Sequence, residues 1–345
     1  MMKKLLVTAV LLMATMSAQA ADAYRLAWSH YTGWEPWGYA ADNGIIKKWA
    51  DKYGIDIEVT LVNDYIESIN LYTAGHFDAV VATNMDALTI PAVGGVDSTA
   101  LVMGDFSNGN DGIVAKNAAK VADLKGRKVM LVELSVSHYM LARALDMNGL
   151  SERDLTLVNT SDAEIASAFL SDDNAAVVTW NPPLQQVRNA KGATLLFDSS
   201  KIPGEIMDLL VVKTDASDAL KKALTGAWYE TLAIMTGKGK ASEEAIEFMA
   251  KQAGATRAEF EAQLRTTALF DDPAKAAAFV SGEEAKKTME YVRTFAFDKG
   301  LYGNGAPSKD LVGIEFPDGS VIGDKNNVKF RFDARYMEMA AKGEL

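Results

Sequence analysis

Residues 24–62, YRLAWSHYTGWEPWGYAADNGIIKKWADKYGIDIEVTLV, contain two strand-like runs with a helix-like segment between them. The runs at 24–29 and 55–62 have strand composition, whereas 38–53 repeats apolar residues at the spacing of an amphipathic helix. A helix that connects two strands is typical of parallel pairing, because parallel strands need a long crossover. The stretch therefore predicts an α/β fold.

The same alternation continues to about residue 200, which predicts doubly wound, mostly parallel sheets flanked by helices. From about residue 216 to 299 helical spacing dominates, and turn signals rich in Gly, Pro and Asn follow residue 303. Within this tail, 328–332 is expected to pair as an edge strand. Further strands are expected at 77–82, 99–104, 129–132, 155–158, 175–179 and 206–213, with helices at 65–74, 137–148 and 162–170.

The chain begins with the features of a secretory leader. Lys3 and Lys4 precede an apolar run at 5–13, and Ala18-Gln-Ala20 provides small residues for cleavage. We expect residues 1–20 to be removed. The sequence contains no Cys, and so it predicts no lipid-anchoring Cys, no disulfide and no thiolate metal site. These features favour an unlipidated protein of the bacterial periplasm.

The length of 345 residues exceeds what one hydrophobic core usually organises, which favours two lobes. The Gly- and Asn-rich loop at 107–112 is the predicted first crossover, and Pro203-Gly204 is the predicted return. Lobe 1 would then comprise 21–110 and 205–345, and lobe 2 would comprise 111–204. We expect the protein to be a monomer.

The net charge and the motifs of the chain argue against several classes of function. A formal net charge of −11 argues against nucleic acid and against anionic membrane surfaces, which both need basic patches. The three His residues, at 30, 76 and 138, lack metal-binding spacing, and the sequence has no Gly-x-Ser-x-Gly elbow and no phosphate-binding Gly loop. We therefore expect neither a catalytic site nor a metal site.

Aromatic residues gather where predicted strands end. Trp28, Tyr31 and Trp34 follow the first strand, and Trp180-Asn181 precedes two prolines that stiffen the chain. In open α/β sheets, ligands bind in the crevice outside the carboxyl ends of the strands. These residues are candidates for a small-molecule site, and burial in the core is the alternative for each ring.

Polar residues follow other predicted strands. Asn84 and Asp86 come after 77–82, and Glu133 and Ser135 open the helix at 137–148. Each could face a cleft, or could instead cap a helix. Asp64 and Asp208 are isolated candidates with the same alternative, or with simple solvation.

Four motifs together resemble the nitrate/sulfonate/taurine-type group of substrate-binding proteins of ABC importers. They are AVVATNMDAL (79–88), DLKGRKV (123–129), SVSHYML (135–141) and VTWNPP (178–183). The resemblance implies a type II periplasmic-binding-protein fold, with the ligand cleft between two lobes that close by hinge motion. It also implies delivery of the ligand to a membrane permease powered by an ATPase, without a cofactor.

One departure from this group bears on the ligand. Anion-binding members carry Gly and small hydroxyl residues where this chain has Glu133-Leu134. A carboxylate there would repel an anion and attract a cation, and aromatic rings could form cation–π walls. The chain looks most similar to the subgroup associated with urea carboxylase, whose members are linked to urea or guanidine. Guanidinium fits better than urea, because it is a planar cation with donors alone.

The aromatic walls of the resulting candidate site are Trp28, Tyr31, Trp34 and Trp180. The candidate carboxylate acceptors are Asp64, Asp86 and Glu133. Weaker polar contacts are expected from Asn84, Ser135 and Asn181. Two alternatives stay open. The first is a sulfonate ligand such as taurine, which would require Glu133 to point away from the cleft. The second is that the fold serves an enzyme of a pyrimidine-precursor pathway.

Overall fold

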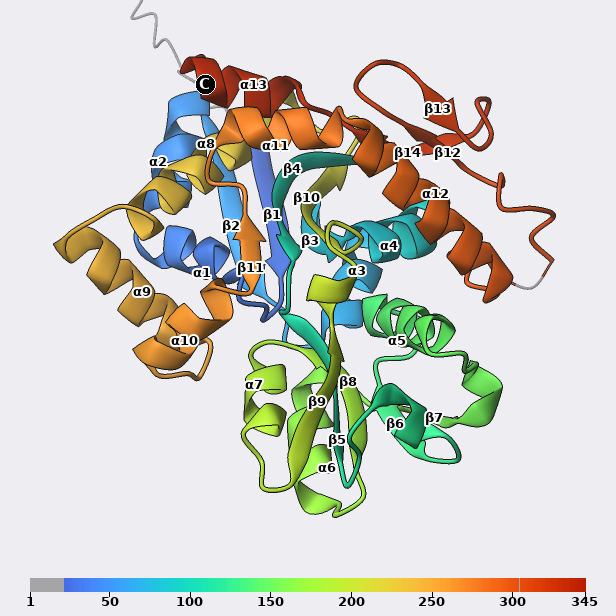
Figure 1. The fold of residues 1–345 in the computed structure, drawn as a ribbon. Helices are drawn as coiled ribbons and strands as arrows, with labels where there is room; N and C mark the ends of the chain where they lie inside the picture. The colour runs from blue at the N-terminus through green and yellow to red at the C-terminus, as the bar shows by residue number, and fades with distance from the viewer. Residues whose placement is uncertain (1–21, 304) are drawn as a thin grey trace, which may run out of the picture.

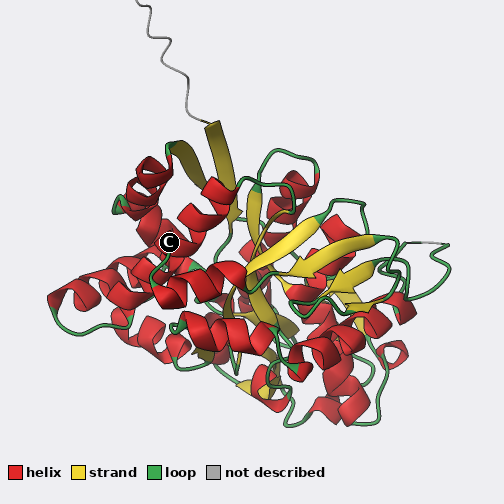
Figure 2. Cartoon of the chain, turned by 90° about the horizontal axis from the view of Figure 1, so that it is seen from above, coloured by secondary structure: helices red, strands yellow, loops and turns green. Residues whose placement is uncertain are grey.

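A computed structural model describes residues 22–303 and 305–345 of the chain. The predicted leader, residues 1–20, lies outside the described residues. The described chain forms two separate β-sheets with helices packed around them, as Figure 1 shows. Figure 2, seen from above, shows helices packed around the strands. This architecture confirms the predicted α/β class.

The larger sheet has the strand order β13-β12-β14-β4-β10-β3-β1-β2, and β11 pairs with β4. Strand β1 runs parallel to β2 and β3, and β10 runs antiparallel to both β3 and β4. The strands are β1 (Asp22–Trp28), β2 (Ile55–Leu61), β3 (Ala79–Thr83), β4 (Ser98–Ser107), β10 (Met207–Lys213), β11 (Thr267–Leu269), β12 (Gly313–Glu315), β13 (Val321–Ile322) and β14 (Val328–Phe332).

The smaller sheet has the order β7-β6-β8-β5-β9. Strand β6 is parallel to β7 and β8, whereas β5 is antiparallel to β8 and β9. The strands are β5 (Asp111–Lys116), β6 (Lys128–Leu131), β7 (Thr156–Asn159), β8 (Ala176–Trp180) and β9 (Ala193–Asp198). Both β3 and β8 are buried along their whole length, as continuous apolar strands between two helical layers should be.

The helices flank both sheets. They are α1 (Glu35–Asp42), α2 (Ile45–Tyr53), α3 (Tyr65–Thr73), α4 (Asn84–Ala87), α5 (Val136–Met147), α6 (Asp162–Ser171), α7 (Pro183–Arg188), α8 (Asp218–Met235), α9 (Lys240–Gln252), α10 (Arg257–Leu264), α11 (Pro273–Val280), α12 (Glu283–Asp298) and α13 (Arg335–Lys342). Among the described residues, no helix is both long enough and apolar enough to cross a membrane.

Several elements differ from the sequence prediction, and the strands β5, β9, β11 and β12 were not expected. The single helix expected at 38–53 is two helices, α1 and α2, because Gly44 adopts a left-handed conformation with φ 74° between them. Strand β14 has the expected bounds but lies between β12 and β4 instead of at an edge. Strand β13, which was not expected, forms that edge.

The chain passes from the larger sheet to the smaller sheet between β4 and β5 and returns between β9 and β10. We propose lobe boundaries at residues 110 and 204, which fall in these two connections. The larger lobe then comprises 21–110 and 205–345, and the smaller lobe comprises 111–204. In Figure 1 the smaller lobe, with α5, α6 and α7, lies below the larger one.

Candidate ligand-binding site

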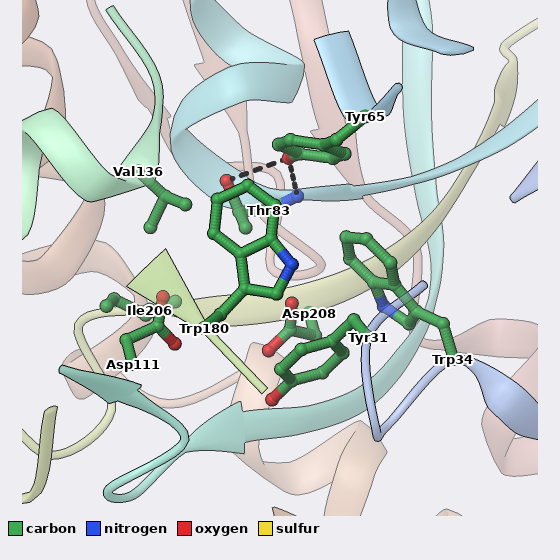
Figure 3. A pocket seen from close by; sticks show the side chains of 9 residues that line it. All are labelled: Tyr31, Trp34, Tyr65, Thr83, Asp111, Val136, Trp180, Ile206 and Asp208. Atoms are coloured by element: carbon green, nitrogen blue, oxygen red, sulfur yellow. Dashed lines mark hydrogen bonds between the residues drawn. The ribbon is translucent and has the colours of Figure 1, made fainter. Parts of the chain in front are cut away.

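A narrow cavity lies between the two lobes and is lined by side chains from both (Figure 3). The cavity is tight, with about the room that one bound water needs, and the atom-free space of about 240 Å³ around it includes its opening to solvent. The lining residues lie at strand ends, at helix starts and at the crossings between the sheets. They are Tyr31, Trp34, Tyr65, Thr83, Asp111, Val136, Trp180, Ile206 and Asp208.

Four aromatic rings form a continuous wall of the cavity. The ring of Trp34 lies 5.0 Å from that of Tyr31 and 5.5 Å from that of Tyr65, measured between centroids. The Tyr65 ring in turn contacts Trp180 of the smaller lobe edge-on at 5.5 Å. The indole Nε1 of Trp180 donates a hydrogen bond to the backbone oxygen of His30 at 3.2 Å. The wall is therefore continuous across the two lobes.

Local packing fixes the loop that carries two of these rings. Trp37 of α1 stacks on Trp228 of α8 with ring centroids 5.0 Å apart, which anchors the end of the loop in the core. Gly33 lies directly against the carboxylate of Asp105 and the ring of Tyr31, where a Cβ atom would overlap both. The Gly in this loop therefore lets Tyr31 and Trp34 approach the sheet closely.

Buried carboxylates surround the cavity. Asp86, Asp105, Asp111 and Asp208 are each at most 2% exposed. The Tyr31 hydroxyl donates to Asp105 Oδ1 at 2.8 Å, and the Tyr65 hydroxyl donates to Asp86 Oδ2 at 2.8 Å. Within the described part of the chain, Asp86 Oδ1, Asp105 Oδ2 and Asp208 Oδ2 are buried without a hydrogen-bond partner. The site therefore offers more acceptors than its own donors satisfy.

The charge of the site is unbalanced. None of the nine residues that line the cavity is Lys or Arg. Burial raises the pKa of Asp86 to about 6 and that of Asp111 to about 7. Burial, together with the neighbouring carboxylates of Asp105 and Asp111, raises the pKa of Asp208 well above its ordinary value. Burial also raises the pKa of Asp105, which lies opposite Asp208 in the register of β4 and β10, so this pair retains a proton near neutral pH.

A bound cation would reverse these pKa shifts, because a positive charge beside a carboxylate favours its ionised form. An anion would raise the pKa values further. No group of three or more His, Asp or Glu side chains in residues 22–303 and 305–345 has the arrangement of a metal site. The lining therefore presents carboxylates and no cationic side chain to whatever occupies the cavity.

The structure brings three of the predicted aromatic residues, Tyr31, Trp34 and Trp180, to the cavity. Trp28 is buried beside them, and its ring contacts His30 edge-on at 5.5 Å, but it does not line the cavity. Asp86 lies immediately behind the lining, where it accepts hydrogen bonds from Tyr65 and Thr83.

The predicted polar residues mostly have structural contacts. Asp64 caps α3 by accepting the backbone N–H of Glu67 at 2.9 Å, and Ser135 caps α5. Asn84 accepts the backbone N–H of Met207 and donates to Glu205 O, which joins the end of β3 to the start of β10. Asn181 donates to Asn110 Oδ1 near the first crossing.

Glu133, on which the sequence argument for a cation rested, is half-buried and does not line the cavity. The carboxylates that line it are Asp111 and Asp208, at the two crossings between the sheets. Of these, the sequence suggested Asp208 as an isolated candidate and missed Asp111. Tyr65, Val136 and Ile206 were also missed, although polar residues at predicted crossings were a usable signal for Asp111.

Residues 54–225 match the family model described as NMT1/THI5 like. A curated relative, a candidate binding protein from Brucella abortus, is 26% identical over 159 residues, which are 46% of this chain and 47% of the relative. The match thus spans about half the length of that relative.

Solved structures resemble the chain over most of its length. The alkanesulfonate-binding protein SsuA from Xanthomonas axonopodis pv. citri, bound to MOPS, has a TM-score of 0.68 at 16% identity, covering 85% of this chain and 96% of that one. The periplasmic aliphatic sulphonate binding protein SsuA from Escherichia coli has a TM-score of 0.66 at 18% identity, with 84% and 95% covered. The periplasmic nitrate-binding protein NrtA from Synechocystis has a TM-score of 0.57 at 14% identity, with 93% and 99% covered. Residues 54–225 thus match the NMT1/THI5-like family, within a chain that has the fold of the periplasmic binding proteins.

Proposed function

We propose that this protein is the substrate-binding component of an ABC importer and that it binds a small nitrogen-rich cation, best represented by guanidinium. The observation that carries the proposal is a set of three buried carboxylate oxygens without a partner among the described residues. One belongs to Asp208, which lines the aromatic cavity, and the others to Asp86 and Asp105, which hydrogen-bond the lining residues Tyr65 and Tyr31. Unpaired buried acceptors call for a ligand that donates hydrogen bonds.

Electrostatics favour a cation. Burying an ionised carboxylate without a partner costs several kcal/mol, and a ligand with positive charge offsets that cost. An anion such as a sulfonate would add a like charge at low effective dielectric. The rings of Trp34, Tyr65 and Trp180 add cation–π attraction of about 0.5–2 kcal/mol each where the cation is desolvated. The buried carboxylates and the aromatic rings therefore both favour a cationic ligand.

Shape favours a planar ligand of few atoms. The cavity is narrow, and the carboxylates of Asp111 and Asp208 reach it from different lobes. Guanidinium is flat, carries N–H donors around its edge and stacks on aromatic rings. One observation favours neutral urea instead: within the described chain Trp34 Nε1 is a buried donor without a partner, which a urea carbonyl could accept. We favour guanidinium because the unpaired acceptors outnumber this single donor.

The fold and the predicted leader support the remaining parts of the proposal. The solved neighbours include periplasmic binding proteins, which supports a periplasmic receptor that delivers its ligand to a membrane permease and its ATPase. The enzyme alternative, a step in pyrimidine-precursor synthesis, predicts turnover of a ligand. A receptor instead predicts stoichiometric binding and recovery of unchanged ligand.

Isothermal titration calorimetry of residues 21–345 against guanidinium, urea and taurine tests the proposal. Ligand concentrations stay in the low millimolar range, at about pH 8, which lies above the raised pKa values of Asp86 and Asp111. One-site heat with guanidinium and none with taurine is the expected result. Binding heat with urea alone would show that the ligand is neutral. Binding heat with taurine alone would refute the proposal of a cation receptor.

A further inference from the structure

Two helices begin beside the cavity, and each presents its first backbone N–H to a carboxylate of the opposite lobe. Tyr65, the first residue of α3 in the larger lobe, donates its N–H to Asp162 Oδ1 of the smaller lobe at 3.3 Å. Val136, the first residue of α5 in the smaller lobe, donates its N–H to Asp86 Oδ2 of the larger lobe at 3.3 Å. The contacts are reciprocal across the cleft.

Helix starts of this kind are ordinarily anion sites. The first N–H groups of a helix have no partner within the helix and carry partial positive charge. Sulfate, phosphate and carboxylate groups bind there readily. Tyr65 and Val136 both line the cavity, so an anionic ligand in the cavity would meet these two helix starts.

In this protein, carboxylates of the chain itself occupy the starts of α3 and α5. Asp86 is fully buried and fixed by the hydroxyl groups of Tyr65 and Thr83, at 2.8 and 2.9 Å. Asp162 is 7% exposed and does not line the cavity, so it acts on the site only through the start of α3. Each helix start thus has a built-in carboxylate in place of a ligand anion.

We propose that Asp86 and Asp162 determine the ligand specificity of the cleft by occupying its two anion-binding helix starts, which excludes anionic ligands. The inference deepens the proposed function, because it names the residues that exclude anions from a cation receptor. Asp86 also leaves one oxygen, Oδ1, without a partner among the described residues, so that it still presents negative charge near the ligand. Asp162 is a positioning residue whose removal frees the N–H of Tyr65.

The test replaces each carboxylate by a methyl group, in Asp86→Ala and Asp162→Ala, and measures taurine and inorganic sulfate binding by calorimetry. Glu67→Ala and Glu164→Ala are matched controls, because both are exposed residues in the first turns of α3 and α6 and lose the same charge. We expect the parent and the controls to give no saturable heat. We expect the two variants to bind an anion at least about tenfold more tightly than the limit set by the parent.

Anion binding by either variant supports the inference for the helix start that it frees. If both variants keep their circular dichroism and reject both anions as the controls do, the inference is wrong. If Asp86→Ala does not fold, Asp162→Ala decides, because Asp162 lies outside the cavity lining. The result is independent of guanidinium binding: a parent that ignores guanidinium refutes the proposed function, whereas variants that ignore anions refute only this inference.

Discussion

Asp111 and Asp208 reach the cavity from the two connections between the sheets, one in each lobe. In the register of the larger sheet, Asp208 pairs with Asp105, so two carboxylates lie side by side in a buried layer. Such a pair is unfavourable in a ligand-free protein unless it holds a proton. In the proposed function, a positively charged ligand would take the place of that proton.

Asp208→Asn should weaken guanidinium binding, because it removes charge at nearly constant shape. Truncating one partner of a buried charge pair typically costs about 2–5 kcal/mol, so we expect a dissociation constant at least about 30-fold higher. The ligand-free variant should melt at a higher temperature than the parent, since a buried charge is removed. Calorimetry and thermal unfolding measure both effects. Asp173→Asn, at an exposed position, is the control and should change neither value.

The pH dependence has a definite sign. Asp86 and Asp111, with pKa values raised to about 6 and about 7, favour the folded state below the unfolded pKa of about 4 and lose that contribution as pH rises through 6 to 7. Guanidinium needs the ionised carboxylates, so its affinity should increase over the same interval. The rise in melting temperature caused by low-millimolar guanidinium should therefore be larger at about pH 8 than at about pH 5. An equal or reversed effect would mean that these carboxylates do not contact the ligand.

At the residue scale, three of the four predicted aromatic residues line the cavity, whereas none of the three predicted carboxylates Asp64, Asp86 and Glu133 does. Tyr31, Trp34 and Trp180 were expected at the site because aromatic residues follow strands whose ends meet at one edge. The contributions of Asp111 and Asp208 depend on how β5 and β10 enter their sheets, which no local pattern reveals. Glu133 was favoured because it lies in the loop before α5, yet among residues 133–136 only Val136, the first residue of the helix, lines the cavity.

Helix packing explains a second feature of the larger lobe. Gly226 lies in the middle of α8, where Gly is ordinarily unfavourable, and faces the indole ring of Trp49 on α2. Trp49 also donates its Nε1 hydrogen to Glu230 on α8 at 2.7 Å. The Gly therefore permits close approach of the two helices, and α1 connects α2 to the loop that carries Tyr31 and Trp34.

Gly226→Ala should destabilise the protein although Ala is the better helix former. A Cβ at this position would overlap the Trp49 ring, and overpacking of a core typically costs about 1–3 kcal/mol. In a Trp49→Ala background the same substitution should instead stabilise by about 1 kcal/mol, because only helix propensity remains. Thermal unfolding of the four proteins of this cycle measures the difference. A stabilising effect in both backgrounds would contradict the packing argument.

At the element scale most boundaries were predictable, because apolar spacing and turn residues mark them. Strand β14 was expected with its observed bounds, but its neighbours were not, since strand order depends on long-range pairing. The division of 38–53 into α1 and α2 was signalled by Asn43-Gly44, which the helical spacing around it concealed.

For the whole molecule, the lobes are held together by contacts outside the cavity as well as within it. Gln263 Nε2 of α10 donates to Gln185 Oε1 of α7 at 2.6 Å, and Lys299 pairs with Glu152 at 2.8 Å. Thr32, beside the aromatic loop, donates to the same Gln263 at 2.8 Å. Binding in the cavity and closure of the lobes should therefore be coupled.

Gln185→Ala should shift the lobes toward an open arrangement without altering the lining of the cavity. One net hydrogen bond contributes about 0.5–1.5 kcal/mol, which corresponds to a guanidinium dissociation constant about 2–10-fold higher if closure precedes tight binding. The radius of gyration of the ligand-free variant in small-angle X-ray scattering should exceed that of the parent and fall when guanidinium is added. Gln186→Ala, at the exposed neighbouring position, is the control. Unchanged affinity and scattering would show that this contact does not influence closure.

The most direct test of the cation receptor is a crystal structure of the protein grown with low-millimolar guanidinium. We predict electron density for a flat ligand against the rings of Trp34, Tyr65 and Trp180, with ligand nitrogens within hydrogen-bonding distance of the carboxylates of Asp111 and Asp208. A cavity without ligand in crystals that contain guanidinium, or an anion bound between these carboxylates, would contradict the account.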